Sequence, residues 1–364
     1  MKDKMGLLEQ EIKSRNLPEL FRNKDNEAVQ NESGWRSRRE EIKNLLCREF
    51  CGCFPRITHR IAGKQVLEDD SAYGGKAVVK TINLGIASDY SYVSFPYRLM
   101  LPKNAERPPV FLYLAFSPEI ADGLGEEILD AGYGVANVYY QDITADYYDE
   151  HQSGLGRFCT RNNYDSWGKL AMWAWGSSRI LDDILEREEI DEKRVAVLGH
   201  SRLGKTALIA GAFDERFSLT AANESGAGGA ALFRGKTGEQ IENLYGKGSR
   251  LWFDGNFFNY RKDLTRMPFD QHFLLSLTAP RHLYIASADR DDWADPKSEF
   301  LTCAECSKVW NLYGEEGLVS PDRLPETGAC YHEGRIGYHL RRGTHYLSRD
   351  DWRQIIAYRN RHGV

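Results

Sequence analysis

The sequence contains no long apolar run: no stretch approaches the roughly 18 consecutive apolar residues that a membrane-spanning helix needs. Its 48 basic and 53 acidic residues nearly balance, giving a formal net charge of -5, so nothing indicates a nucleic-acid partner. Residues 1–13 include basic side chains but lack the apolar segment of a signal peptide. We therefore expect no membrane and no nucleic-acid partner. The protein is expected to be cytoplasmic as the sequence stands, or secreted if a signal peptide has been removed.

Cysteines are few and follow no disulfide framework, since there are seven, an odd number. Only Cys303 and Cys306 have the C-x-x-C spacing of half a zinc site, and they lie in a predicted helix. Buried thiols are the simpler interpretation. We therefore expect no metal and no cofactor.

Internal repeats, low-complexity segments and linkers are also missing, so no composition change divides the chain into several large domains. A length of 364 residues with 41% hydrophobic residues permits one sizeable core. Residues 1–55 are polar and predict a helical arm outside that core. Residues 56–364 are expected to form a single catalytic domain.

Apolar and alternating segments predict a large sheet. Residues 77–84 and 90–100 predict two antiparallel strands, and the continuous apolar run at 109–116 predicts a strand buried on both faces. Helical spacing of apolar residues predicts a helix over 167–186. Further strands are predicted at residues 132–140, 193–198, 219–222, 281–287 and 336–340. This alternation predicts an α/β fold, a mostly parallel sheet covered on both faces with its site at the carboxyl ends of the strands.

A serine lies where a predicted strand meets a predicted helix, in Gly199-His-Ser-Arg-Leu-Gly-Lys205. Such a turn exposes the serine hydroxyl beside free helix N–H groups that can hold an oxyanion, as in the nucleophile elbow of α/β-hydrolases. The second glycine of the usual G-x-S-x-G pattern comes one place late, with Leu203 in its slot. The motif alone therefore leaves open a strand–turn–helix without catalytic function.

Chain order selects the partners of this serine, because the order in such hydrolases is serine, acid, histidine. His345 follows the last predicted strand and precedes the final helix, so we expect a catalytic base rather than a solvated loop histidine. Asp291 follows the predicted strand 281–287, and Glu224 follows the strand 219–222. The order permits either as the acid.

Two cations accompany Ser201. Arg202 follows it directly, so both its backbone N–H and its guanidinium could reach an oxyanion. Lys205 lies four residues after the serine, on the same face of a helix. The two cations suggest an acidic or hydroxyl-rich substrate, and the alternative is that they pair with local carboxylates such as Asp214 or Glu224.

These residues resemble the glucuronoyl esterases, carbohydrate esterase family 15, in their bacterial form. Four blocks carry the resemblance in the right order: Gly199–Lys205, Asn223–Gly229, Trp293–Pro296 and Gly343–His345. The G-[CH]-S-R-x-G-K signature of the family includes the late glycine. The resemblance covers roughly residues 75–360.

The resemblance implies an α/β-hydrolase fold and cleavage of the ester between 4-O-methyl-glucuronic acid on xylan and lignin alcohols. It implies that Ser201 is the nucleophile, His345 the base and Arg202 the oxyanion-stabilising residue, with Glu224 or Asp291 as the acid. It also implies that the uronate hydroxyls and ring are bound by Lys205, Glu239 and Trp293.

Two other functions are alternatives to this expectation. One is an acetylxylan-type deacetylase with the same triad, and the other is a non-catalytic carbohydrate-binding relative. A glucuronate ester or glucuronoxylan is thus the expected partner, and no oligomeric state is indicated by the sequence. Residues 117–120 do not look like the usual family segment.

Overall fold

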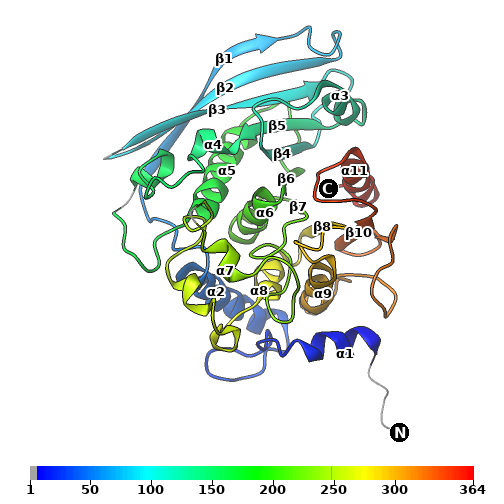
Figure 1. Cartoon of the computed structure of the whole chain (residues 1–364). Helices are drawn as coiled ribbons and strands as arrows, with labels where there is room; N and C mark the ends of the chain where they lie inside the picture. The colour runs from blue at the N-terminus through cyan, green and yellow to red at the C-terminus, as the bar shows by residue number, and fades with distance from the viewer. Residues whose placement is uncertain (1–5, 90, 159, 247) are drawn as a thin grey trace.

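The computed structural model describes residues 6–89, 91–158, 160–246 and 248–364. A mixed sheet of ten strands runs through it (Figure 1). The strands are arranged in the order β1-β2-β3-β5-β4-β6-β7-β8-β10-β9. Its strands are β1 (His59–Asp69), β2 (Ala77–Ser88), β3 (Tyr92–Pro102), β4 (Val110–Ala115), β5 (Gly134–Tyr139), β6 (Val195–His200), β7 (Leu219–Asn223), β8 (His282–Ala288), β9 (Cys330–Tyr331) and β10 (Ile336–Arg341). The six strands β5, β4, β6, β7, β8 and β10 pair in parallel, while β1, β2 and β3 form an antiparallel extension.

Helices cover both faces of this sheet (Figure 1). The α-helices are α1 (Leu7–Ser14), α2 (Glu32–Glu49), α3 (Asp122–Asp130), α4 (Tyr140–Ile143), α5 (Lys169–Leu185), α6 (Arg202–Phe213), α7 (Ile241–Leu244), α8 (Gln271–Ser276), α9 (Pro296–Cys306), α10 (Lys308–Asn311) and α11 (Arg349–His362). Three short 3₁₀ helices are η1 (Gly154–Phe158), η2 (Asn256–Tyr260) and η3 (Leu264–Arg266). Among the described helices, none is both long and apolar enough to cross a membrane.

Alternating side chains of the central strands enter two separate cores. Phe111 and Ala196 pack with α3 and α11 on one face, whereas their neighbours Leu112 and Val197 pack with α5 and α6 on the other. Every residue of β7 and β8 is buried, which explains why apolar residues predominate in both strands and do not alternate with polar ones. The predicted α/β fold with a mostly parallel, doubly covered sheet is confirmed.

The predicted strands and the long helix are all present, with differences at their ends. The antiparallel pair predicted at residues 77–84 and 90–100 forms between β2 and β3. Tyr90, inside the second predicted strand, lies outside the described residues. The sequence did not predict β1, because most of its residues are exposed and no alternation of apolar and polar residues marks it as a strand.

The expectation that residues 1–55 stay outside the core is wrong for α2. Its Trp35, Ile42 and Leu46 are fully buried and belong to the larger core. Arg39 of the same helix is also buried and donates to the carbonyl of Leu277 at 3.1 Å. These apolar residues lie on one face of a helix that is otherwise polar, so average composition concealed them. The domain boundary placed after residue 55 stays a prediction.

Candidate active site

Ser201 lies at the sharp turn between β6 and α6. Its backbone has φ 57° and ψ −125°, a conformation that side-chain-bearing residues rarely adopt, and its N–H donates to the Asn223 carbonyl at 2.9 Å. Gly199 permits the turn, because a Cβ there would lie 2.0 Å from the Leu203 carbonyl oxygen. The strain therefore holds the serine hydroxyl at the carboxyl end of β6, beside the first N–H groups of α6.

The late glycine of the motif has a packing function. A Cβ on Gly204 would lie 3.0 Å from the Cβ of Ser225, so the glycine lets α6 approach the loop after β7. Leu203, in the usual glycine slot, is fully buried in the core instead. The departure from G-x-S-x-G leaves the serine turn itself intact.

His345 joins Ser201 to a carboxylate. It lies in the loop between β10 and α11, and its Nε2 is 2.9 Å from Ser201 Oγ. Its Nδ1 is 2.6 Å from Oδ2 of Asp291, which follows β8. The imidazole of His345 thus lies within hydrogen-bond distance of both the serine hydroxyl and the carboxylate, as proton transfer from a serine requires.

The two candidate acids lie at different distances from His345. Asp291 is at 2.6 Å from Nδ1, whereas the Oε2 of Glu224 is at 3.3 Å. The buried Glu224 carboxylate is also engaged elsewhere: the Arg341 guanidinium donates to one oxygen, and the Tyr346 N–H donates to the other at 2.8 Å. This geometry favours Asp291 as the acid that orients the imidazole, with Glu224 as a second, more distant carboxylate.

Electrostatics distinguishes these three groups. Burial raises the pKa of Glu224 to about 7, although His345 and Arg341 act in the opposite direction. Burial favours a higher pKa for Asp291, but the hydrogen bond and the charge of His345, together with the Ala294 N–H, outweigh it and hold the pKa below its ordinary value. For His345, burial favours a lower pKa, yet hydrogen bonds to Asp291 and Glu224 dominate and raise it to about 9.

Arg341, at the end of β10, was not identified from the sequence. Besides Glu224, its Nε donates to both carboxylate oxygens of Asp351 at 3.0 and 2.8 Å, and its guanidinium donates to the carbonyls of Thr344 and Tyr346. The arginine therefore holds the backbone on both sides of His345. Its position four residues before His345 could have drawn attention to it. Its contact with Glu224 could not be predicted, because the two residues are 117 positions apart in the sequence.

Arg202 is held in place by residues that sequence reasoning also missed. Its guanidinium donates to Asp146 at 2.5 Å and lies 4.7 Å from the ring centroid of Trp252. The Trp252 indole N–H donates to the other Asp146 oxygen at 2.8 Å. Asp146 lies beyond α4, so only the fold brings it to the elbow. Neither residue belonged to a recognisable motif.

The two cations pair with carboxylates other than the expected ones. Lys205, which is buried, lies 3.4 Å from Glu239 Oε2 and donates to the Ser225 carbonyl at 2.8 Å. Asp214, proposed as a partner from the sequence, pairs with Arg216 instead. Each cation beside the serine thus has a carboxylate partner, and neither partner is Asp214 or Glu224.

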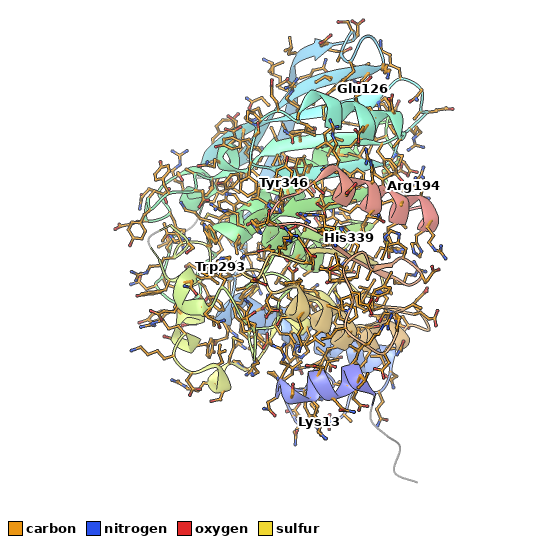
Figure 2. All side chains as sticks on the ribbon, turned by 45° about the vertical axis from the view of Figure 1, so that its right-hand side comes forward. Lys13, Glu126, Arg194, Trp293, His339 and Tyr346 are labelled. Carbon is orange, nitrogen blue, oxygen red and sulfur yellow. The ribbon has the colours of Figure 1, made fainter. Side chains whose placement is uncertain are left out.

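Glu239 and Trp293 lie on adjacent loops at the same edge of the sheet. The Glu239 N–H donates to the Trp293 carbonyl at 2.9 Å, which joins the loop after β7 to the loop after β8. Trp293 is 52% exposed, and so is accessible for stacking on a ring. Figure 2 labels Trp293 together with Tyr346, which lies in the loop after the neighbouring strand β10. The fold therefore brings the predicted binding residues Lys205, Glu239 and Trp293 together, and their roles stay predictions.

One group of described residues offers three ligand atoms to a metal, with His200, Glu224 and His345 atoms within 4.8 Å of one another. All three side chains already have partners. The His200 Nδ1 lies 2.6 Å from Asn223 Oδ1, and Glu224 is bound by Arg341. His345 lies between Ser201 and Asp291. No step of the chemistry needs an ion here. Cys303 and Cys306 are buried in α9, as expected for idle thiols.

Comparisons with known proteins agree on one family. A sequence model described as "Glucuronyl esterase, fungi" matches residues 85–314. A protein named carbohydrate esterase MZ0003, from an unknown prokaryotic organism, is 31% identical, covering 97% of this chain and 91% of its own. A 4-O-methyl-glucuronoyl methylesterase of Wolfiporia cocos is 28% identical, covering 82% of this chain and 72% of its own.

Solved structures give the same result. A glucuronoyl esterase from Solibacter usitatus superposes with a TM-score of 0.85 at 33% identity, covering 94% of this chain and 97% of that one. A promiscuous family 15 esterase from a marine bacterial metagenome superposes with a TM-score of 0.86 at 31% identity, covering 95% and 96%. The predicted α/β-hydrolase fold is confirmed, and the chain belongs to the glucuronoyl esterases of carbohydrate esterase family 15.

Proposed function

We propose that this protein hydrolyses esters of 4-O-methyl-glucuronic acid, as in lignin–glucuronoxylan linkages, with Ser201 as the nucleophile. The observation that carries the proposal is the line of hydrogen-bond distances from Ser201 through His345 to Asp291, at 2.9 and 2.6 Å. The substrate class is supported by the family and by relatives named 4-O-methyl-glucuronoyl methylesterase.

The mechanism is a two-step acyl transfer. His345 accepts the proton of Ser201 as Oγ attacks the ester carbonyl, and Asp291 stabilises the imidazolium that forms. The backbone N–H and the guanidinium of Arg202 bind the oxyanion. His345 then gives its proton to the departing alcohol, and afterwards activates the water that releases the free acid.

The binding residues suit an esterified uronate. Esterification removes the negative charge of the sugar's carboxylate, so the polar groups of the sugar other than the ester itself are hydroxyl and ether oxygens. The Lys205–Glu239 pair, at 3.4 Å, is close to neutral overall and offers one donor and one acceptor group. Trp293 supplies an exposed aromatic face for the ring. We therefore expect Lys205 to bind hydroxyl groups of the sugar rather than to attract an anion.

The substrate class is tested by side-by-side turnover of methyl glucuronate, benzyl glucuronate and acetylated xylan. We expect kcat/KM for the glucuronate esters to be about 10²-fold higher or more, because an acetyl ester leaves polar groups of the site without partners. A preference for acetyl groups would favour a deacetylase. Failure to react with a serine-directed phosphonate would indicate a non-catalytic relative.

Replacing Arg202 tests the oxyanion site. Arg202→Ala should lower kcat for methyl glucuronate about 10²–10³-fold, because the guanidinium donor is lost while the backbone N–H stays. KM should change little. Arg216→Ala, which removes a cation paired with Asp214 and Asp182 at the far end of α6, is the matched control and should keep wild-type kcat. Equal effects of the two variants would refute the role of Arg202.

Replacing Glu224 tests its effect on the base. His345 acts as a base only when neutral, and carboxylates that favour the imidazolium raise its pKa to about 9. Glu224→Gln removes one of these charges, so the pKa falls and the acid limb of the kcat/KM–pH profile should move by about one unit or more to lower pH. Asp292→Asn, an exposed neighbour of Asp291, is the control and should leave the limb in place. A shift to higher pH in Glu224→Gln would contradict the assignment.

A further inference from the structure

A cavity of about 830 Å³ lies apart from the catalytic residues, between residues 148–166 and 245–261. The first segment connects α4 with α5 through η1, and the second runs from α7 into η2, at the lower left of Figure 1. His151 Nε2 lies 3.1 Å from the Leu251 carbonyl oxygen and joins the two segments. The volume is that of a site for a small molecule or a short oligosaccharide.

The cavity and the active site share one wall. Leu251 and Phe253 line the cavity. Trp252, between them, contacts the guanidinium of Arg202 at 4.7 Å and donates to Asp146. A ligand in the cavity would therefore be bound by the same short segment that supports the elbow of the active site.

The charge of the cavity lining is mainly positive. The lining contains four arginines, Arg157, Arg161, Arg250 and Arg261, and two acidic residues, Glu150 and Asp254. The guanidinium groups of Arg250 and Arg261 each lie 4.7 Å from the ring centroid of Tyr245, which fixes their orientation. Among the ion pairs of the described residues, none includes Arg157 or Arg250, so both exposed cations are available to an anion.

A buried carboxyl group in the same lining lacks a partner. Asp254 is 2% exposed, and its Oδ1 accepts the Phe257 N–H at 2.8 Å, while its Oδ2 has no hydrogen-bond partner. Burial raises its pKa to about 8, so the group is protonated at neutral pH and can donate a hydrogen bond. A buried polar atom without a partner is costly, and an oxygen of a bound ligand would satisfy it.

The chemistry of this lining indicates a carboxylated sugar. Guanidinium groups bind carboxylates in a planar, two-bond geometry. The carboxyl of Asp254 and the side-chain amides of Gln152 and Asn259 suit hydroxyl groups, and Tyr148, 50% exposed, offers an aromatic face. We propose that this cavity binds a free uronic acid residue carried by the same glycan as the esterified one, an inference that rests on the proposed function.

The test uses the full chain, two substrates and two double variants. Arg157→Ala/Arg250→Ala should raise KM about 10-fold for a partly methyl-esterified glucuronoxylan oligosaccharide that retains a free uronate, since charged hydrogen bonds are lost. KM for methyl glucuronate should not change. Lys262→Ala/Arg266→Ala removes two exposed cations of the same region that do not line the cavity, and should behave as wild type on both substrates. An unchanged KM for the oligosaccharide in the first variant would overturn the proposal.

Direct binding separates this proposal from the proposed function. Glucuronic acid, glucose and inorganic phosphate are titrated calorimetrically into Ser201→Ala and into Ser201→Ala/Arg157→Ala/Arg250→Ala. We expect glucuronic acid to bind the first protein and to lose about 10-fold in affinity in the second. Phosphate binding as tight as that of glucuronic acid, or equal binding of glucose, would overturn the sugar-acid assignment. This readout needs no turnover, so inactivity of the wild type on methyl glucuronate would count against the proposed function alone.

Discussion

Ser201→Ala should lose roughly 10⁶-fold in kcat on methyl glucuronate, because removing the serine of a serine–histidine–acid triad eliminates the acyl-enzyme route. Alanine keeps the small side chain that the strained turn accommodates, so folding and substrate binding should persist. The measurement is the initial rate of acid release, followed by a burst assay for the acyl-enzyme.

The control for this variant is Ser14→Ala. Ser14 is an exposed serine of α1, far from the elbow in sequence, and its hydroxyl donates only to the Glu11 carbonyl. It should keep wild-type kcat and covalent labelling by a phosphonate. Retention of wild-type hydrolysis by Ser201→Ala would disprove the mechanism at its first step.

Asp291→Asn should lower kcat about 10⁴-fold. Asparagine carries no negative charge, and its amide NH2 can donate to Nδ1, so the imidazole is held in the wrong tautomer and its charged form loses stabilisation. The 2.6 Å contact makes this loss larger than that of Glu224→Gln, whose carboxylate lies at 3.3 Å. The measurement is kcat for both single variants and for the double variant on one ester.

The comparison of these variants decides between the two acids. A greater loss in Glu224→Gln would make Glu224 the triad acid, and Asp291 the auxiliary one. Equal losses would mean that neither carboxylate dominates. Arg341→Met would help to interpret either result, because it releases Glu224 and the loop around His345 without removing a carboxylate.

The central strands and the elbow could be predicted because their signals are local. A strand buried on both faces must be apolar throughout, and a serine between such a strand and a helix occupies one recognisable turn. His345 could be placed because chain order in this fold limits the choices. The exposed strand β1 and the buried face of α2 gave no such signal, since β1 is exposed at almost every position and the buried face of α2 lies within a charged sequence.

The choice of acid and the supports of the cations could not be predicted, because they depend on distances between segments remote in sequence. Asp291 and Glu224 both follow strands, and only the relative position of the loops makes one contact 2.6 Å and the other 3.3 Å. Asp146 and Trp252 reach Arg202 across 56 and 50 positions of sequence, through a hydrogen bond and a ring contact.

The paired cations at the elbow have a consequence for the end of the catalytic cycle. Hydrolysis converts a neutral ester into a carboxylate anion, and the anion forms next to Arg202 and Lys205. Because Asp146 and Glu239 already balance these charges, the product meets little net attraction at the position where it forms. The transient oxyanion is held there by its covalent bond, whereas the free acid is not. We therefore expect release of the acid to be fast and inhibition by accumulated product to be weak.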